Sequence, residues 1–420
     1  MNKIYKVLAL ATNDSRNAGH AISVAKKTDT SKFDVRVVTL VSKYSDSTYA
    51  LYPSRWMYYL HTYFFRYLFN FLRTGYFRLS KANDPHCFVN VDLSLATAEK
   101  ILKKYGDIPD VIKLHWVDGF VTPKILYNLH RLTGAEIVWV FTDEYPLGAG
   151  CHYPCECRGF INGCVNCPIA FNKNAVKKMF NRKCYYLKEL PVTIVGPTNA
   201  VIKAKDSVIL KDKTIIKSIS RPSFPLQDRN YCRNLFAFSD NDFVILFGAA
   251  NVNDKRKGIK YTIDALNKVK SEQNIDNITL LVVGQDNTDL LTQLSGFKVK
   301  SLGFLKQNDL FQAFRASDLF ISTTIADTGP QMVLFSVFYG VPVVSFNVGY
   351  AFDFVKHKAN GYISDYCDSN SVADGIEYFL SMPMSERNKV ESYNNELLIK
   401  ISEYPQAMDI LYEHLCNKPQ

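Results

Sequence analysis

Two adjacent basic residues, Arg256 and Lys257, precede Gly258 at the start of a segment with helical periodicity. A short loop separates them from the apolar run 243–247 (FVILF), which is typical of a buried strand. Cationic side chains beside the free amide groups of a helix N-terminus favour the binding of phosphate. A solvated, lysine-rich helix start has the same pattern, so these residues alone support both interpretations.

Five of the ten cysteines fall between residues 151 and 167. Ten cysteines are too few for a disulfide scaffold in a chain of 420 residues, so this concentration indicates a local site. The pattern allows three interpretations, which are a zinc ion bound by four thiolates, two disulfides, or buried free thiols. A zinc ion with four thiolate ligands would be structural, because it leaves no coordination position for a substrate.

Alternating strands and helices must position these residues. Short β-branched runs alternate with amphipathic segments along most of the chain, which predicts parallel sheets built from βαβ units. The pattern starts twice, at Val7 and at Phe243, and the proline-containing segment 220–228 between the two halves is the predicted linker. We therefore expect an α/β protein with two doubly wound domains and a ligand-binding cleft between the carboxyl ends of their sheets.

Composition limits the partners of the protein. Fifty Lys and Arg residues against 40 Asp and Glu residues give a net charge of +10, which favours phosphates, nucleotides or an anionic membrane surface. A basic helix with base-reading residues is missing from the sequence, so nucleic acid is not an expected partner. The apolar run near the N-terminus lacks a small-residue cleavage site and is predicted to be a buried strand. The sequence contains no uncharged apolar run of about 18 residues, so a membrane-spanning helix is not expected.

An aromatic segment stands out in the N-terminal half. Residues 49–77 contain 13 aromatic side chains, and between Asp46 and Asp84 there are five basic residues and no acidic one. Residues 56–73 are long enough for a helix of about five turns. Aromatic and basic residues together suit a membrane surface, contacted through residues 55–81, or a lipid-linked acceptor. A helix packed on the sheet with its arginines outward is the alternative.

The motifs of the C-terminal half, taken in order, resemble the nucleotide-sugar half of a GT-B glycosyltransferase, and specifically family 4 of the retaining glycosyltransferases. They are FVILFGAANVNDKRKG (243–258), LLVVGQD (280–286), SLGFL (301–305, expected as a strand), IADTGPQMVLFSVFYGVPVVSFNVG (325–349) and NGY (360–362). The resemblance implies two Rossmann-like domains. Residues 1–219 would bind the acceptor, residues 220–399 would bind the nucleotide sugar, and residues 400–420 would cross back onto the first domain.

The resemblance also implies roles for individual residues. Lys257 would hold the donor diphosphate, with Arg256 in place of an arginine usually found upstream, and Asp327 would orient the donor sugar. An N-cap is the structural alternative for Asp327. Phe335 occupies the position of a carboxylate that normally binds the ribose, so either a neighbour such as Ser336 makes that contact or donor binding is weakened. The other expected donor contacts are Gly248, Asn251, Gly284, Gly303, Phe304, Leu305, Thr328, Gly329 and Pro330. No metal-binding D-x-D triplet is evident, and we expect no catalytic metal.

The N-terminal half contains LHWVDGF (114–120) and VWVFTDEYPLGAGCHY (138–153), which resemble a polysaccharide-assembling subset of that family with a cysteine-rich loop. Thr142 stands where the subset has a histidine, and His115 is the expected substitute. The resemblance places acceptor-side residues at Gly19, His20, His115 and Asp143. It places a structural zinc ion on Cys151, Cys157, Cys164 and Cys167, with Cys155 as a spare thiol.

These features together imply transfer of a hexose-type sugar, with retention, from a nucleotide-sugar donor to a growing, lipid-linked surface glycan. The mechanism implied is front-face displacement assisted by the leaving phosphate. The expected location is cytoplasmic, peripheral on the inner face of the membrane. Thr142 and Phe335 depart from the family pattern, and they support an alternative in which the chain is a catalytically degenerate partner of an active glycosyltransferase.

Overall fold

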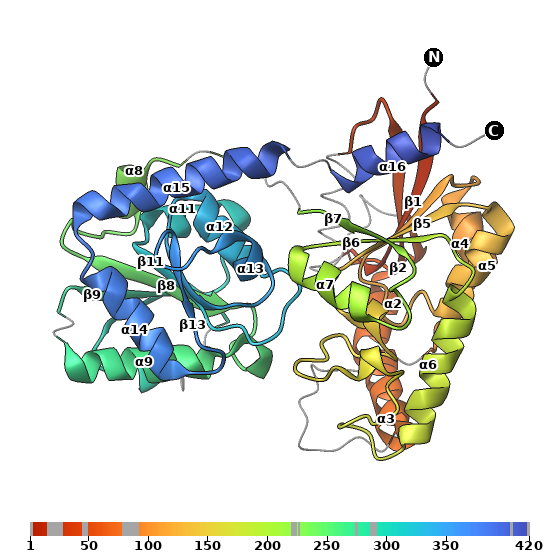
Figure 1. Cartoon of the computed structure of the whole chain (residues 1–420), viewed down its shortest axis with the longest axis horizontal. Helices are drawn as coiled ribbons and strands as arrows, with labels where there is room; N and C mark the ends of the chain where they lie inside the picture. The colour runs from red at the N-terminus through yellow and green to blue at the C-terminus, as the bar shows by residue number, and fades with distance from the viewer. Residues whose placement is uncertain are drawn as a thin grey trace. The chain divides into compact units, whose positions relative to one another are not determined.

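The structure is a computed structural model of the chain, and it describes residues 3–14, 28–43, 49–77, 92–219, 225, 227–273, 276–285, 292–403 and 406–417. The chain forms two compact units. The first comprises Met1–Gly196, Ala200–Ser218 and Pro405–Gln420, and the second comprises Pro197–Asn199 and Ile219–Tyr404. Most of the predicted linker, 220–224 and 226, lies outside the described residues. Each unit is an α/β fold around a parallel sheet (Figure 1).

The described part of the first unit contains a seven-stranded sheet in the order β3-β2-β1-β4-β5-β6-β7, with all neighbouring strands parallel. Its strands are β1 (Tyr5–Asn13), β2 (Phe33–Val41), β3 (Tyr49–Tyr52), β4 (Val111–Leu114), β5 (Glu136–Val140), β6 (Val192–Gly196) and β7 (Thr214–Lys217). Its helices are α2 (Arg55–Tyr59), η1 (Leu60–Phe65), α3 (Arg66–Phe77), α4 (Ala98–Tyr105), α5 (Pro123–Thr133), η3 (Tyr145–Leu147), η4 (Gly159–Ile161), α6 (Lys173–Leu187), α7 (Thr198–Asp206) and α16 (Ala407–Cys416).

Both faces of this sheet are buried, which explains the uninterrupted apolar runs of its strands. Leu8 and Leu10 of β1 point into a large core with α4, α5 and α6, whereas Val7 points into a smaller one that includes Leu411 of α16. The C-terminal helix α16 also places Tyr412 edge-on against Tyr5, with ring centroids 5.7 Å apart. The last helix of the chain therefore completes the core of the first unit.

The described part of the second unit contains a six-stranded parallel sheet in the order β10-β9-β8-β11-β12-β13. Its strands are β8 (Phe243–Ala249), β9 (Ile278–Gly284), β10 (Lys298–Ser301), β11 (Leu319–Ser322), β12 (Val343–Phe346) and β13 (Gly361–Ser364). Its helices are α8 (Arg229–Leu235), η5 (Lys255–Lys257), α9 (Ile259–Glu272), α11 (Gln307–Ala316), α12 (Gln331–Phe338), α13 (Tyr350–Phe354), α14 (Ser369–Leu380) and α15 (Met384–Glu403).

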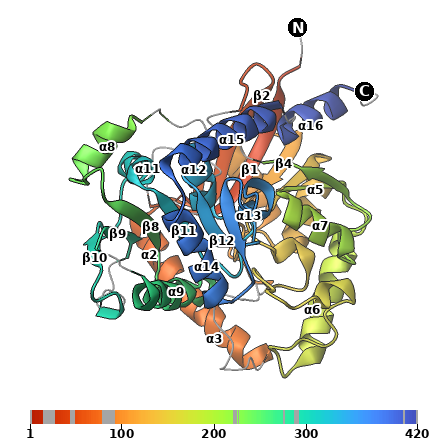
Figure 2. The ribbon, with the colours of Figure 1, turned by 60° about the vertical axis from the view of Figure 1, so that its left-hand side comes forward.

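Alternate residues of β8 explain the two layers of helices around this sheet. Ile245 and Phe247 pack into the core formed with α9 and α14, whereas Val244 and Leu246 pack into the core formed with α8, α11 and α12. Figure 2 shows the two sets of helices on opposite faces of the sheet. A strand that is apolar on both sides and flanked by helices is the arrangement predicted for a doubly wound domain.

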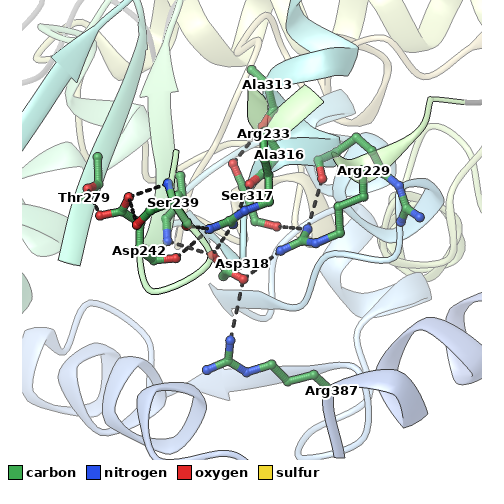
Figure 3. A network of polar contacts seen from close by, with 12 residues as sticks. Arg229, Arg233, Ser239, Asp242, Thr279, Ala313, Ala316, Ser317, Asp318 and Arg387 are labelled. Atoms are coloured by element: carbon green, nitrogen blue, oxygen red, sulfur yellow. Dashed lines mark hydrogen bonds and ion pairs between the residues drawn. The ribbon is translucent and has the colours of Figure 1, made fainter. Parts of the chain in front are cut away.

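One carboxylate connects the helices of the second unit to its sheet (Figure 3). Asp318, immediately before β11, accepts from Arg229 at 2.7 Å and from Arg233 at 3.0 Å, and Arg387 lies 3.5 Å away. It also accepts the backbone amide of Val244 at 2.8 Å. Arg229 and Arg233 belong to α8 and Arg387 to α15, so Asp318 fixes both helices to the amino end of the strands.

Replacing Asp318 with Asn should destabilise the second unit. The substitution leaves the buried Arg233 guanidinium without its charged partner, and breaking a buried ion pair typically costs about 3–5 kcal/mol. Urea unfolding measures the change. Asp374→Asn is the control in the same unit, because Asp374 is exposed and its lysine partner is 3.9 Å away. We expect the control to change stability by less than about 1 kcal/mol. Equal effects of the two variants would contradict this role for Asp318.

Candidate functional site

The order of both sheets reverses beside their first strand. β1 pairs with β2 on one side and β4 on the other, and β8 pairs in the same way with β9 and β11. In doubly wound sheets, ligands bind outside the carboxyl ends of the strands at this point. The predicted phosphate-binding residues follow β8 and Asp327 follows β11, whereas His115 follows β4 and Asp143 follows β5. Each unit therefore has its own candidate site.

In the second unit, the loops after β8 and β11 are fastened together by backbone contacts. Ile325 donates its amide to the carbonyl of Arg256 at 2.9 Å, and the Thr323 hydroxyl donates to the carbonyl of Gly258 at 2.8 Å. Gly258 has φ +63°, and a Cβ added there would lie 1.9 Å from the Thr323 carbonyl oxygen. Only glycine fits this position, because both its backbone conformation and the close approach exclude a side chain.

Three residues that the sequence analysis singled out meet at these loops. Asp327 Oδ2 accepts from Lys257 Nζ at 2.7 Å and from Arg256 Nη1 at 3.0 Å. Arg256 also donates to Asp254 Oδ2 at 3.0 Å and to the Ala326 carbonyl at 2.8 Å. The other oxygen of Asp327 accepts the amide of Gly329 at 3.0 Å.

The cluster is only partly exposed, with the side chains of Asp327, Arg256 and Lys257 13%, 14% and 24% exposed, and its formal charges cancel. Burial by itself raises the pKa of Asp327, but Lys257 and Arg256 outweigh that effect and hold its pKa below the usual value. Two cations face two carboxylates, Asp254 and Asp327. An anionic ligand that reached Lys257 would therefore compete with Asp327 for its ammonium group. Asp327 is not the N-cap of α12, since Pro330 occupies that position.

The other residues expected around the donor lie on the same edge of the sheet. Gly284, at the end of β9, donates its amide to the carbonyl of Gly303 at 2.8 Å, and Phe304 is exposed. Strand β10 ends at Ser301, so the prediction of a strand over 301–305 is wrong beyond that residue. Gly303 adopts a left-handed conformation with φ 60°, which ends the strand. The remaining expected contacts fall in three places. Gly248 and Asn251 lie at or just after the end of β8, and Leu305 follows β10. Thr328, Gly329 and Pro330 lie between β11 and α12.

The ribose contact expected from Ser336 is not supported by the structure. Ser336 is fully buried, and its hydroxyl donates to the Val341 carbonyl at 3.0 Å. The neighbouring Phe335 packs its ring edge-on against Phe311, with centroids 5.3 Å apart. The position that the resemblance assigns to a ribose carboxylate is thus part of an aromatic cluster beneath α12.

In the first unit, the partner of Asp143 is His152 and not His115. His152 Nδ1 lies 2.5 Å from Asp143 Oδ2, and its Nε2 lies 3.5 Å from Asp118 Oδ2. His115 is buried at the end of β4 and donates its amide to the Leu10 carbonyl at 3.0 Å. Gly19 and His20, the other expected acceptor-side residues, lie outside the described residues.

The two carboxylates next to His152 favour the protonated form of its ring. Burial lowers its pKa, but the carboxylates of Asp118 and Asp143 outweigh burial and raise the pKa to about 9. Its ring also stacks on Trp116, with centroids 4.5 Å apart and an interplanar angle of 16°. One feature of the sequence points to this residue, because His152 is adjacent to Cys151 in the CHY triplet that ends the segment 138–153.

The cysteine-rich loop contains free thiols in this structure. A Cβ added at Gly159 would lie 3.4 Å from the Cys157 sulfur and 3.9 Å from the Cys164 sulfur, so these two thiols are close together. Burial raises the pKa of Cys151, Cys164 and Cys167, and the neighbouring thiols raise it further. Across the residues described, no three His, Cys, Asp or Glu side chains are arranged to hold a metal ion. The side chains as placed do not form the zinc site, which stays a prediction.

The four-thiolate hypothesis predicts about one zinc ion per chain in protein purified under reducing conditions. Cys164→Ser should lower the zinc content and the melting temperature, because it removes one ligand of the pair Cys164 and Cys167. Cys155→Ser should change neither, since Cys155 is the spare thiol. Elemental analysis measures the metal. Folded, reduced protein without zinc would leave buried free thiols as the explanation.

Comparison with known proteins gives this geometry a context. The family described as Glycosyl transferases group 1 matches residues 242–382, which include the cluster around Asp327. An uncharacterized glycosyltransferase of Methanocaldococcus jannaschii, MJ1607, is 26% identical over 158 residues. That match covers 36% of this chain and 39% of the archaeal protein, so the chain aligns with well under half of its relative.

Solved structures match over nearly the whole chain. Sucrose-phosphate synthase from Thermosynechococcus elongatus superposes with a TM-score of 0.64 at 12% identity, covering 98% of this chain and 99% of the other. Anabaena Alr3699/HepE, solved in complex with UDP-glucose, gives a TM-score of 0.61 at 13% identity, with coverage of 98% and 99%. The fold is therefore that of the GT-B glycosyltransferases. Its second unit contains the segment that matches the glycosyl transferases group 1 family.

Proposed function

We propose that this protein is a retaining glycosyltransferase whose second unit binds a nucleotide-sugar donor. The observation that carries the proposal is the partly exposed cluster of Arg256, Lys257 and Asp327. It lies at the strand ends where doubly wound sheets bind ligands, within the segment matched by the glycosyl transferases group 1 family. A diphosphate is the part of the donor that needs two fixed cations.

The chemistry follows from this charge arrangement. Breaking the bond between sugar and diphosphate leaves negative charge on the phosphate oxygens, and Lys257 and Arg256 would stabilise that charge as it develops. The diphosphate would take over part of the hydrogen bonding of Lys257 and Arg256. Asp327 would then accept a hydrogen bond from a hydroxyl group of the sugar. We infer front-face displacement with retention, assisted by the leaving phosphate. Two cations already supply the electrostatic stabilisation, so we propose no catalytic metal ion.

Lys257→Ala should weaken the binding of a nucleoside diphosphate by at least about tenfold, because it removes a charge-assisted hydrogen bond to phosphate. Titration with UDP, GDP, CDP and ADP, followed by thermal shift, identifies the preferred base and measures the loss. Lys255→Ala is the matched control, since Lys255 belongs to the same short helix η5 but is exposed.

The rate of sugar transfer should also fall in Lys257→Ala, because the lysine stabilises the phosphate most strongly as that group leaves. Near-normal diphosphate affinity in a folded Lys257→Ala protein would contradict the assignment of the donor site. Binding that is intact in the wild type but never accompanied by transfer would favour the alternative, a catalytically degenerate partner protein.

We also propose that the acceptor is a lipid-linked glycan and that the first unit contacts the anionic inner face of a membrane. A row of exposed aromatic residues supports this proposal. Trp56, Tyr59, Tyr63, Tyr67 and Phe71 are all exposed and recur every three or four residues along α2, η1 and α3, which places them on one side of the helix. We call this row the aromatic face. No described helix is long and apolar enough to cross a membrane.

Charge supports the same occupant for the aromatic face. The sequence between Asp46 and Asp84 contains basic residues and no carboxylate, so nothing in it would repel anionic headgroups. Trp and Tyr are the side chains that settle at the level of the headgroups, since each combines an apolar ring with a polar group.

Binding to vesicles tests this surface. The protein should sediment with vesicles of phosphatidylcholine and phosphatidylglycerol, less with phosphatidylcholine alone, and less at high salt. Replacing Trp56 and Tyr67 with Ser should weaken binding by about tenfold, because two apolar rings no longer enter the interface. Tyr185→Ser is the control, since Tyr185 of α6 and Tyr67 are both 74% exposed. Unchanged binding by the double variant would contradict the proposal.

A further inference from the structure

Four side chains from three segments of the first unit converge beyond the carboxyl ends of its strands. Trp116 and Asp118 belong to the loop after β4, Asp143 follows β5, and His152 ends the turn that begins at Asp143. His152 lies between the two carboxylates, 2.5 Å from Asp143 and 3.5 Å from Asp118, and its ring stacks on Trp116. The group lies next to the point where the strand order reverses, between β1 and β4. Ligands of doubly wound domains bind outside the carboxyl ends of the strands at this point.

Backbone contacts hold this group in place. Thr12, near the end of β1, donates its amide to the Trp116 carbonyl and its hydroxyl to the Asp118 carbonyl, both at 2.8 Å. Glu144 donates its amide to the His152 carbonyl at 2.7 Å, which closes the turn. The arrangement is therefore fixed by the strand ends and does not depend on the side chains alone.

Burial changes across the group. The side chains of His152 and Asp143 are each 7% exposed, whereas that of Asp118 is 41% exposed. A histidine that only stabilised the core would be satisfied by Asp143, and it would not need a second carboxylate at the surface. The interactions thus run outward from Asp143 through His152 to Asp118, and the partly exposed Trp116 stacks on the same histidine.

The chemistry at the surface end suits a neutral sugar. A carboxylate accepts hydrogen bonds from neighbouring hydroxyl groups, and an aromatic ring packs against the apolar C–H face of a pyranose. A metal ion is not the ligand, because no described group of three such side chains is arranged to hold one. A phosphate group is disfavoured, because the exposed end of the group is the Asp118 carboxylate and like charges repel.

We propose that Asp118 and Trp116 form a binding site for glycan hydroxyl groups in the first unit. His152, held by Asp143, is the positioning residue that orients the Asp118 carboxylate. The proposal deepens the proposed function, and rests on it only where it identifies this glycan as the acceptor of the transferred sugar. The binding itself needs no donor and no residue of the second unit.

Methyl glycosides of glucose, galactose, mannose and N-acetylglucosamine, titrated at millimolar concentration, are suitable probes. Saturation-transfer NMR should show saturable binding of at least one of them to the wild type. Asp118→Asn should weaken that binding by at least about tenfold, because an amide accepts hydroxyl hydrogen bonds less strongly than a carboxylate. Asp34→Asn is the matched control, since Asp34 is 42% exposed, is held by Arg36 at 2.9 Å, and lies at the opposite end of the strands.

Two substitutions of His152 separate positioning from stability. His152→Gln keeps a group that can bond to Asp118 and should retain much of the affinity for the glycoside. His152→Leu should bind the glycoside at least about tenfold more weakly than the wild type, as Asp118→Asn does. Both variants are compared at a temperature where circular dichroism shows them folded. Equal affinity of the Gln and Leu variants would overturn the positioning role.

Absence of saturable binding of every glycoside to the wild type, or equal affinity of the wild type and Asp118→Asn, would overturn the site. Binding of the preferred nucleoside diphosphate is measured on the same variants. We expect Asp118→Asn to bind it as the wild type does, because Lys257 and Arg256 belong to the other unit. Loss of glycoside binding with intact diphosphate binding therefore separates failure here from failure of the donor site.

Discussion

The proposed donor site depends on one interaction, which is the sharing of the Asp327 carboxylate by Lys257 and Arg256. A largely buried carboxylate is costly unless it is paired, and here the pairing also fixes the loop after β8 against the loop after β11. The bond between the Ile325 amide and the Arg256 carbonyl strengthens the same junction. The two cations are therefore oriented by the protein itself, so the proposed diphosphate ligand would have to displace a carboxylate but would not have to organise the lysine and arginine.

The fold could be predicted from the sequence because its signals are local and repeated. Apolar runs such as 243–247 are buried on both sides of a sheet, and the helices between them must cross over its faces, so two doubly wound units follow from the alternation alone. Arg256 and Lys257 could be predicted because basic residues open a helix a short loop after an apolar strand, whereas Asp327 was expected only from the resemblance to a family. The end of β10 could not be predicted as easily, because it depends on the conformation of a single glycine, Gly303.

Contacts between distant side chains could not be predicted in this way. His115 directly follows a strand and was expected to replace the histidine missing at Thr142, but its side chain is buried. The histidine that contacts Asp143 is His152, which comes from a turn nine residues later. Ser336 was expected at a ligand because of its neighbour in the sequence, although the helix α12 rotates it into the core. The rotation of a helix and the path of a turn are set by packing, which sequence spacing does not record.

The strand β11 separates two kinds of residues along its short length. Asp318 and its arginines lie at the amino end, and the segment from Thr323 to Asp327 follows the carboxyl end. Four strand residues at about 3.3 Å each place these groups roughly 13 Å apart. Stability and the proposed ligand contacts therefore belong to opposite ends of one strand. Under the proposed function, the loops at the carboxyl end could be exchanged for others with a new donor preference while the arginine cluster keeps the unit folded.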